Sequence, residues 1–183
     1  HCAARVHMMD DESSDPLTAF RKVNVEGTRK LAEEAIKNKV RRFIFISSIK
    51  VNGEQTESGQ PFRSTDQPKP TDPYGISKYE AEQVLLQLAQ QSDLEVVIIR
   101  PVLVYGPQVK GNFNSLLKLS STRIPLPLKS INNKRSMVYV ENLVDFIFHC
   151  VDCSNIVNQV LLVSDDEDLS LPDTIRIMRK KLN

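Results

Sequence analysis

The stretch that decides the fold is Thr71-Asp72-Pro73-Tyr74-Gly75-Ile76-Ser77-Lys78-Tyr79-Glu80-Ala81-Glu82. Asp72-Pro73 predicts the start of a long helix, because proline fits a first turn, where its missing N–H costs nothing. Tyr74 and Lys78 are four residues apart and therefore share one face of that helix. A tyrosine has an ordinary pKa of about 10 and becomes a base near neutrality only if nearby cations favour its phenolate. The pair predicts such a base, although Tyr-x-x-x-Lys also occurs in helices by chance.

The composition is that of one globular domain. The chain has 183 residues, of which 40% are hydrophobic and 26% charged, with a net charge of +1. This balance gives no sign of a nucleic-acid-binding surface, and no apolar run is long enough for membrane insertion. The cysteines Cys2, Cys150 and Cys153 predict reduced thiols and a cytoplasmic protein, with neither a disulfide framework nor a metal site.

Strands and helices are predicted to alternate along the chain. The continuous apolar run 41–48 is typical of a strand that is covered on both faces of a parallel sheet. Helices are predicted at 16–39, 74–91, 112–119, 141–150 and from 170, and the other strands at 94–99, 135–140 and 159–163. The order predicts an α/β fold with a mainly parallel sheet.

Two hydroxyl side chains, Ser47 and Ser48, end the strand of residues 41–48. Ligands of open α/β sheets bind beyond the carboxyl ends of the strands, although serines at strand ends also commonly form turns. Consecutive elements of a βαβ unit lie side by side, which brings Ser48 near Tyr74. We therefore expect Ser48 to bind a substrate oxygen while Tyr74 takes its proton and Lys78 holds the phenolate.

Five motifs in register carry a family resemblance. They are Asn24–Thr28, Ile46–Gly53, Asp72–Lys78, Arg100-Pro101 with Val104–Pro107, and Arg135–Val140. The chain resembles the extended short-chain dehydrogenase/reductases, and within them the NAD-dependent epimerase/dehydratase branch that acts on nucleotide sugars. This resemblance implies part of a Rossmann-type, doubly wound parallel sheet in residues 1–107. It also implies a small C-terminal substrate-binding region in residues 108–183, intertwined with that sheet.

The resemblance also implies roles for individual residues. The catalytic set is Ser48, Tyr74 and Lys78, and the cofactor is NAD, with NADP left open. Cofactor contacts are expected from Ala3, Ala4, Asn24, Ser47, Tyr74, Lys78, Pro101 and Val104. Substrate contacts are expected from Ser48, Lys50, Asn112 and Arg135, and a guanidinium suits a sugar diphosphate because it binds phosphate oxygens bidentately. Asn24 and Arg135 could instead be solvated positions of a helix and a strand end.

The sequence departs from the family pattern in two places. The glycine-rich turn of the dinucleotide site is absent, so we expect an N-terminally truncated chain that binds NAD(P) weakly or not at all by itself. Dehydratases of this branch carry Thr-Asp-Glu where this chain has Ser48-Ile49-Lys50, which disfavours dehydration. Epimerases usually have an aromatic residue at the position of Asn52.

The predicted activity is 4-epimerisation of a UDP-hexose or UDP-N-acetylhexosamine. A nucleotide-sugar 4-dehydrogenase or 4-keto reductase of surface polysaccharide synthesis is the alternative, and a non-catalytic dinucleotide-sensing relative is a further one. Family members commonly dimerise through two long helices, so the resemblance implies a homodimer through residues 16–39 and 74–91. Val25, Ala32 and Leu86 are candidate contacts in that interface.

Overall fold

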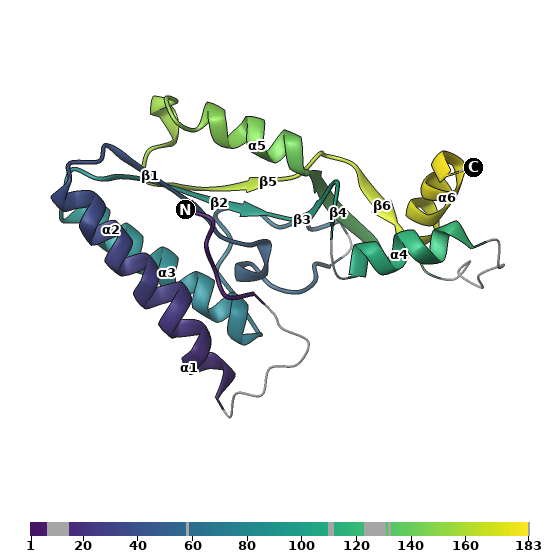
Figure 1. Ribbon diagram of the computed structural model, residues 1–183, viewed down its shortest axis with the longest axis horizontal. Coiled ribbons are helices and arrows are strands. Elements are labelled where there is room, and N and C mark those ends of the chain that lie inside the picture. Colours follow the sequence, from purple (N-terminus) through teal and green to yellow (C-terminus); the bar gives the residue numbers. More distant parts are fainter. Residues whose placement is uncertain (7–14, 58, 110–111, 123–130, 132, 183) are drawn as a thin grey trace. The chain divides into compact units, whose positions relative to one another are not determined.

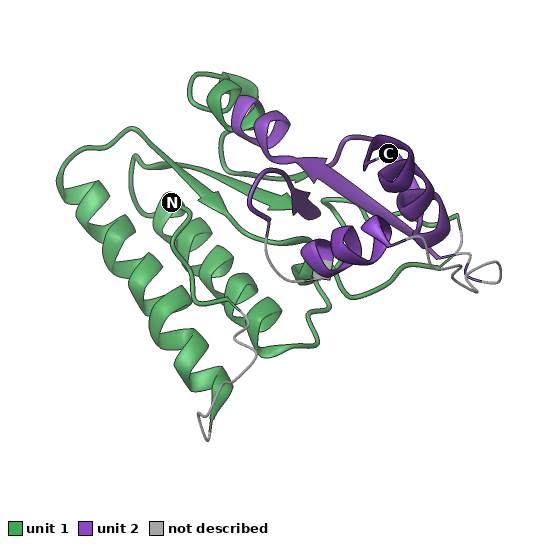
Figure 2. Ribbon diagram, turned by 45° about the vertical axis from the view of Figure 1, so that its right-hand side comes forward, with its two compact units in different colours: residues 1–101, 146–163 green, residues 102–145, 164–183 purple. Residues whose placement is uncertain are grey.

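The computed structural model describes residues 1–6, 15–57, 59–109, 112–122, 131 and 133–182 (Figure 1). The chain forms two compact units that are interleaved along the sequence (Figure 2). The first unit contains residues 1–101 and 146–163, and the second contains residues 102–145 and 164–183. No helix within the described ranges is long and apolar enough to cross a membrane.

A three-stranded parallel sheet organises the first unit, in the order β1-β2-β5. Its strands are β1 (Arg42–Ile46), β2 (Glu95–Pro101) and β5 (Gln159–Val163). The N-terminal segment runs beside β1 in the same direction, because His1 N donates to Ile44 O at 2.8 Å and Ile46 N donates to His1 O at 3.2 Å. The residues after His1 therefore leave at the carboxyl edge of the sheet.

Two long helical runs cover one face of this sheet (Figure 1). The first contains α1 (Pro16–Phe20), a π-helical segment (Arg21–Glu26) and α2 (Gly27–Lys37), where the sequence predicted one helix. The second is α3 (Pro73–Gln90), as predicted. π-helical turns inside α-helices frequently occur at functional sites.

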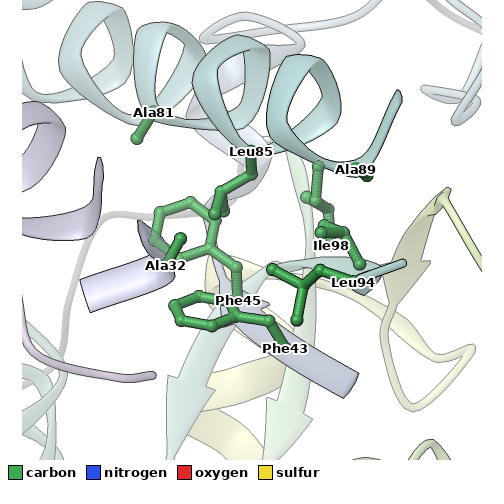
Figure 3. Close-up of a cluster of buried hydrophobic side chains, with 9 residues drawn as sticks. Ala32, Phe43, Phe45, Ala81, Leu85, Ala89, Leu94 and Ile98 are labelled. Atoms are coloured by element: carbon green, nitrogen blue, oxygen red, sulfur yellow. The ribbon is translucent and has the colours of Figure 1, made fainter. Parts of the chain in front are cut away.

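The core lies between the sheet and these helices (Figure 3). Its members are Ala32, Phe43, Phe45, Ala81, Leu85, Ala89, Leu94, Val96 and Ile98. Strand β2 is buried on both faces, but β1 alternates between half-buried and buried positions. The prediction that residues 41–48 are covered on both faces is therefore wrong for β1, since only every second side chain of this strand is fully buried.

The second unit has a smaller sheet in the order β3-β4-β6, with β3 parallel and β6 antiparallel to β4. The strands are β3 (Leu103–Tyr105), β4 (Lys134–Tyr139) and β6 (Asp168–Ser170). The accompanying helices are α4 (Asn112–Ser121) and α6 (Leu171–Leu182), while α5 (Val140–His149) begins in this unit and ends in the first. The sequence did not predict β3 or β6, which at three residues each are too short for a periodic pattern.

Candidate active site

The start of α3 is fixed by Asp72, as the sequence suggested. Its side-chain Oδ1 accepts a hydrogen bond from Gly75 N at 2.6 Å, and its backbone oxygen accepts one from Ile76 N at 2.9 Å. A Cβ at position 75 would lie 3.0 Å from Lys50 O, so the absence of a side chain lets the helix start close to the segment that follows Ser48. The first turn of α3 and the carboxyl end of β1 are thereby held together.

The predicted partners Ser48 and Tyr74 are in contact. Ser48 caps a short 3₁₀ helix, Ile49–Val51, and its side-chain oxygen accepts from Lys50 N at 3.2 Å. The Ser48 side chain also lies near the Tyr74 hydroxyl and, as a hydrogen-bonding neighbour, lowers the pKa of this tyrosine. The Tyr74 ring packs edge-on against Phe20 with ring centroids 6.1 Å apart. This arrangement places a serine hydroxyl and a phenol where both can reach one substrate oxygen.

The pKa of Tyr74 is raised above its ordinary value of 10.0, whereas the sequence predicted that Lys78 would lower it. Burial is the main cause, and the Asp72 carboxylate adds to it; Ser48 and the Lys50 ammonium act in the opposite direction. Desolvation of the phenolate therefore outweighs the nearby cations in the protein alone.

Lys78 lies one turn further along α3 and is only 2% exposed. Its Nζ lies 4.1 Å from the centroid of the Phe45 ring, a cation–π contact. Burial lowers the pKa of Lys78 from 10.5 to about 8, while the charge of Glu82 opposes this change. Because this pKa lies close to neutral pH, the protonation of Lys78 is sensitive to any change in the charges around it.

Lys50 forms ion pairs with two carboxylates, Asp72 and Glu54, the second at 3.0 Å. These pairs tie the 3₁₀ helix to the cap of α3. The contact of Lys50 with the substrate stays a prediction. Among the described residues, the Lys50 ammonium compensates the negative charge of Asp72, which lies near Tyr74.

Asn24 is buried in the π-helical segment and is not a solvated position. Its Oδ1 accepts from Arg5 N at 2.7 Å, and its Nδ2 donates to Arg5 O at 3.0 Å and to Ser77 Oγ at 2.9 Å. Ser77 Oγ in turn donates to Tyr74 O at 2.8 Å. One amide therefore connects the segment that carries Ala3 and Ala4 to the helix that carries the tyrosine.

The structure places the remaining predicted residues as follows. In the first unit Ala3 is exposed, Ala4 is half-buried and Pro101 ends β2 in a buried position. In the second unit Val104 lies in β3, and Arg135 is exposed on β4 beside a cavity of about 240 Å³. Asn112 begins α4, and its side chain lies outside the described residues.

The sequence did not predict the buried charge network behind the catalytic residues. Arg100 Nε and Nη2 donate to the two carboxylate oxygens of Glu82 at 2.9 and 2.5 Å. Ser47 Oγ donates to Glu82 Oε1 at 2.5 Å, and Arg100 Nη1 donates to Asn52 Oδ1 at 2.9 Å. Two features of the sequence could have indicated this network. Glu82 lies one turn after Lys78 on the predicted helix, and Arg100 lies at the end of an apolar strand.

Most of the chain matches a known protein family. Residues 1–160 match the model of the NAD dependent epimerase/dehydratase family. The chain is 56% identical over 177 residues to UDP-glucose 4-epimerase of Vibrio cholerae, covering 96% of this chain and 54% of that protein. It is 32% identical to an N-acetyl-alpha-D-glucosaminyl-diphospho-ditrans,octacis-undecaprenol 4-epimerase of Escherichia coli O157:H7, covering 95% of this chain and 52% of that protein.

Solved structures share the fold. UDP-glucuronic acid 4-epimerase of Bacillus cereus in complex with NAD superposes with a TM-score of 0.82 at 23% identity, covering 97% of this chain and 57% of the other. The chain thus spans about half the length of the curated relatives that it matches.

Proposed function

The chain belongs to the NAD dependent epimerase/dehydratase family, and we propose that its protein catalyses 4-epimerisation of a UDP-linked hexose or N-acetylhexosamine with NAD as cofactor. The observation that carries this proposal is the placement of the Tyr74 hydroxyl near Ser48, with buried Lys78 one turn along the same helix. The 56% identity to a UDP-glucose 4-epimerase supports the choice of reaction.

Residues of the first unit fit the nicotinamide end of NAD. Ala3 and Ala4 have small side chains and lie just beyond the point where the N-terminal segment pairs with β1. Lys78 is the residue that would hold the nicotinamide ribose, and Pro101 ends the neighbouring strand. When bound, NAD supplies a hydride acceptor and a positively charged ring that favours the Tyr74 phenolate.

In the proposed mechanism Tyr74 takes the proton of the C4 hydroxyl while the C4 hydrogen leaves as a hydride. Ser48 donates a hydrogen bond to the same oxygen and stabilises its developing charge. The product of this half-reaction is a 4-ketone, and Tyr74 now carries the proton that the reverse step needs. Return of the hydride to the opposite face of the sugar and of the proton to oxygen gives the C4 epimer.

The residues after Ser48 separate this reaction from dehydration. Loss of water from C5 and C6 needs an acid pair, and this chain has Ile49 and Lys50 there, with Lys50 in ion pairs with Asp72 and Glu54. If the 4-ketone leaves before hydride returns, the enzyme acts as a 4-dehydrogenase or, in reverse, a 4-keto reductase. Epimerases usually have an aromatic residue at the position of Asn52. Asn52 is instead a buried member of the polar network, and this difference leaves the dehydrogenase or reductase activity as the second candidate function.

The second unit is proposed to bind the UDP moiety. Arg135 lies beside a cavity of about 240 Å³ that is otherwise lined mainly by apolar side chains, among them Leu103, Phe113, Leu116 and Met137. A guanidinium can bind diphosphate oxygens bidentately while the apolar wall receives a base. Asn112 is the second proposed contact.

We propose a homodimer that forms through helices near 16–39 and 74–91. Val23 and Leu31 are 44% and 46% exposed on the first of these and offer apolar contacts to a second copy. Ala32, a contact suggested by the sequence, is fully buried in the core and is excluded from that surface. We place the protein in the cytoplasm, a reducing compartment that suits the free thiols of its cysteines.

The test uses the natural full-length protein that contains this chain, supplied with NAD and a panel of UDP-sugars. The proposal predicts that one sugar is converted to its C4 epimer without net NADH. Stoichiometric NADH with a 4-keto product would instead identify a dehydrogenase, and no turnover of any sugar would contradict both activities.

A further inference from the structure

One half-buried carboxylate, that of Asp165, joins three elements of the second unit (Figure 2). Asp165 lies in the loop before β6, and its Oδ2 accepts a hydrogen bond from Tyr139 N at 2.9 Å, where β4 ends and α5 begins. Its Oδ1 accepts from Asn142 Nδ2 in the first turn of α5 at 2.9 Å, and its own N–H donates to Met137 O on β4 at 2.9 Å. The Tyr105 hydroxyl of β3 donates to the same Oδ2 over a longer distance, 3.4 Å. Asp165 thus connects β3, β4 and the start of α5.

Tyr105 is the middle ring of an aromatic stack in this unit. It stacks on Phe113 of α4 with ring centroids 5.4 Å apart and 26° between the ring planes, and its centroid also lies 5.4 Å from that of Tyr139. The chain just after Tyr105 approaches α5 so closely that a Cβ at Gly106 would lie 2.5 Å from Val140 Cγ1. The Tyr105 ring is therefore held on both faces, and the backbone at its base has little room to move.

This stack supports the wall of the cavity of about 240 Å³ in the same unit. Phe113, Met137 and Arg135 line the cavity. Tyr105 packs against the first of them, and Asp165 is bonded to the backbone of the second. Asp165 can therefore act on a ligand through the residues that line the cavity. A carboxylate at the N-terminus of α5 also stabilises that helix, so an experiment must separate this structural effect from an effect on binding.

We propose that Asp165 is a positioning residue for nucleotide binding, which holds the aromatic stack and β4 in the arrangement that receives UDP before the ligand arrives. The inference rests on the proposed function, in which this cavity binds UDP. If only about a tenth of the molecules held that arrangement without Asp165, the apparent affinity for UDP would fall about tenfold. The charge of Asp165 acts in the opposite direction, because UDP is an anion and like charges repel. A role through position and a role through charge therefore predict opposite changes in affinity.

The test measures the binding of UDP and of NAD separately, by calorimetric titration of the natural full-length protein. In Asp165→Ala the Kd of UDP should rise about tenfold, while the Kd of NAD, whose proposed contacts lie mainly in the first unit, should change little. Asp165→Asn keeps the size and hydrogen-bonding atoms of the side chain and removes its charge, so it should bind UDP at least nearly as tightly as the wild type.

The matched control is Asp166→Asn, which removes an equal charge from the exposed neighbouring residue. Asparagine tolerates the left-handed backbone at this position, where φ is 59°. Its Kd of UDP should equal that of the wild type. The kcat of Asp165→Ala at saturating substrate should also change little, because the residue acts on binding and not on the chemical step.

A second variant, Tyr105→Leu, covers the case in which Asp165→Ala does not fold. It removes the ring that supports Phe113 and leaves the bonds of Asp165 to Tyr139 and Asn142 in place. The Kd of UDP should rise in this variant too. An unchanged Kd of UDP in either folded variant, tighter binding of UDP by Asp165→Ala, or an equal loss of affinity for UDP and NAD would overturn the proposal.

The same measurements separate this role from the proposed function. If the variants bind UDP as predicted but the wild type epimerises no UDP-sugar, the role of Asp165 stands and the proposed function is rejected. If the wild type epimerises a UDP-sugar and Asp165→Ala binds UDP as tightly as the wild type does, the proposed function stands and the role of Asp165 is rejected. A wild type that does not bind UDP would overturn both.

Discussion

Replacing Gly75 by alanine tests how closely the catalytic helix is fitted to the segment behind it. Alanine in place of glycine inside a helix ordinarily stabilises a protein by about 1 kcal/mol. At this position the new Cβ would lie 3.0 Å from Lys50 O, 3.2 Å from Asp72 Oδ1 and 3.2 Å from Pro70 Cβ. These contacts are too close, and two of the three atoms belong to a backbone or a proline ring that cannot simply rotate away.

The cost can be estimated from the groups that must move. Overpacking of a tight site costs about 1–3 kcal/mol, and loss of the Asp72 cap of α3 adds about 1 kcal/mol. Set against the helical gain of about 1 kcal/mol, Gly75→Ala should lower the free energy of unfolding by about 1–3 kcal/mol. The matched control is Gly27→Ala. Apart from the neighbouring backbone of its own helix, a Cβ at Gly27 would meet no described heavy atom within 4 Å, so this substitution should stabilise the protein.

The assay is urea unfolding of the purified variants, followed by far-UV circular dichroism because the chain has no tryptophan. The two variants should differ by about 2–4 kcal/mol, with opposite signs relative to the wild type. If Gly75→Ala were as stable as Gly27→Ala, the close fit between α3 and the segment after Ser48 would be refuted.

Three further predictions concern the charges at the active site and the packing of the hydrophobic core. Lys50→Met should move the acid limb of the kcat profile to higher pH, because the Tyr74 pKa is lowered by Lys50 and raised by Asp72; an unmoved limb would argue against this compensation. Leu85→Ala should lower the free energy of unfolding by about 3–4 kcal/mol in urea, since this core side chain is fully buried. The wild type should gain stability relative to Lys78→Met between pH 8 and about 10.5, where the unfolded state binds more protons than the folded state does; equal pH dependence of the two would contradict the lowered pKa of Lys78.

The local patterns of the sequence predicted most elements of the fold. Asp72-Pro73 marked the start of α3, and the apolar runs marked β1, β2 and β5 in a parallel sheet. The same patterns carry no information on position within a sheet. The alternation of half-buried and buried positions in β1 was therefore missed, as were the three-residue strands of the second unit.

The contact between Ser48 and Tyr74 followed from the order of elements, because neighbours in a βαβ unit lie side by side. The predicted lowering of the Tyr74 pKa was wrong, because its direction depends on how deeply the helix start is buried and on the nearby charge of Asp72. The pairing of Glu82 with Arg100 was also out of reach, because two residues on different elements meet only after the sheet and α3 have packed.

The most direct test of the account is the turnover of Tyr74→Phe in the natural full-length protein with NAD and the UDP-sugar that it epimerises. The phenylalanine ring keeps the packing against Phe20 and removes only the hydroxyl that lies near Ser48. The account predicts that kcat falls by about 10²–10⁴-fold, the usual contribution of a positioned general base, while the affinity for NAD is little changed. An unchanged kcat would contradict the assignment of Tyr74 as the catalytic base.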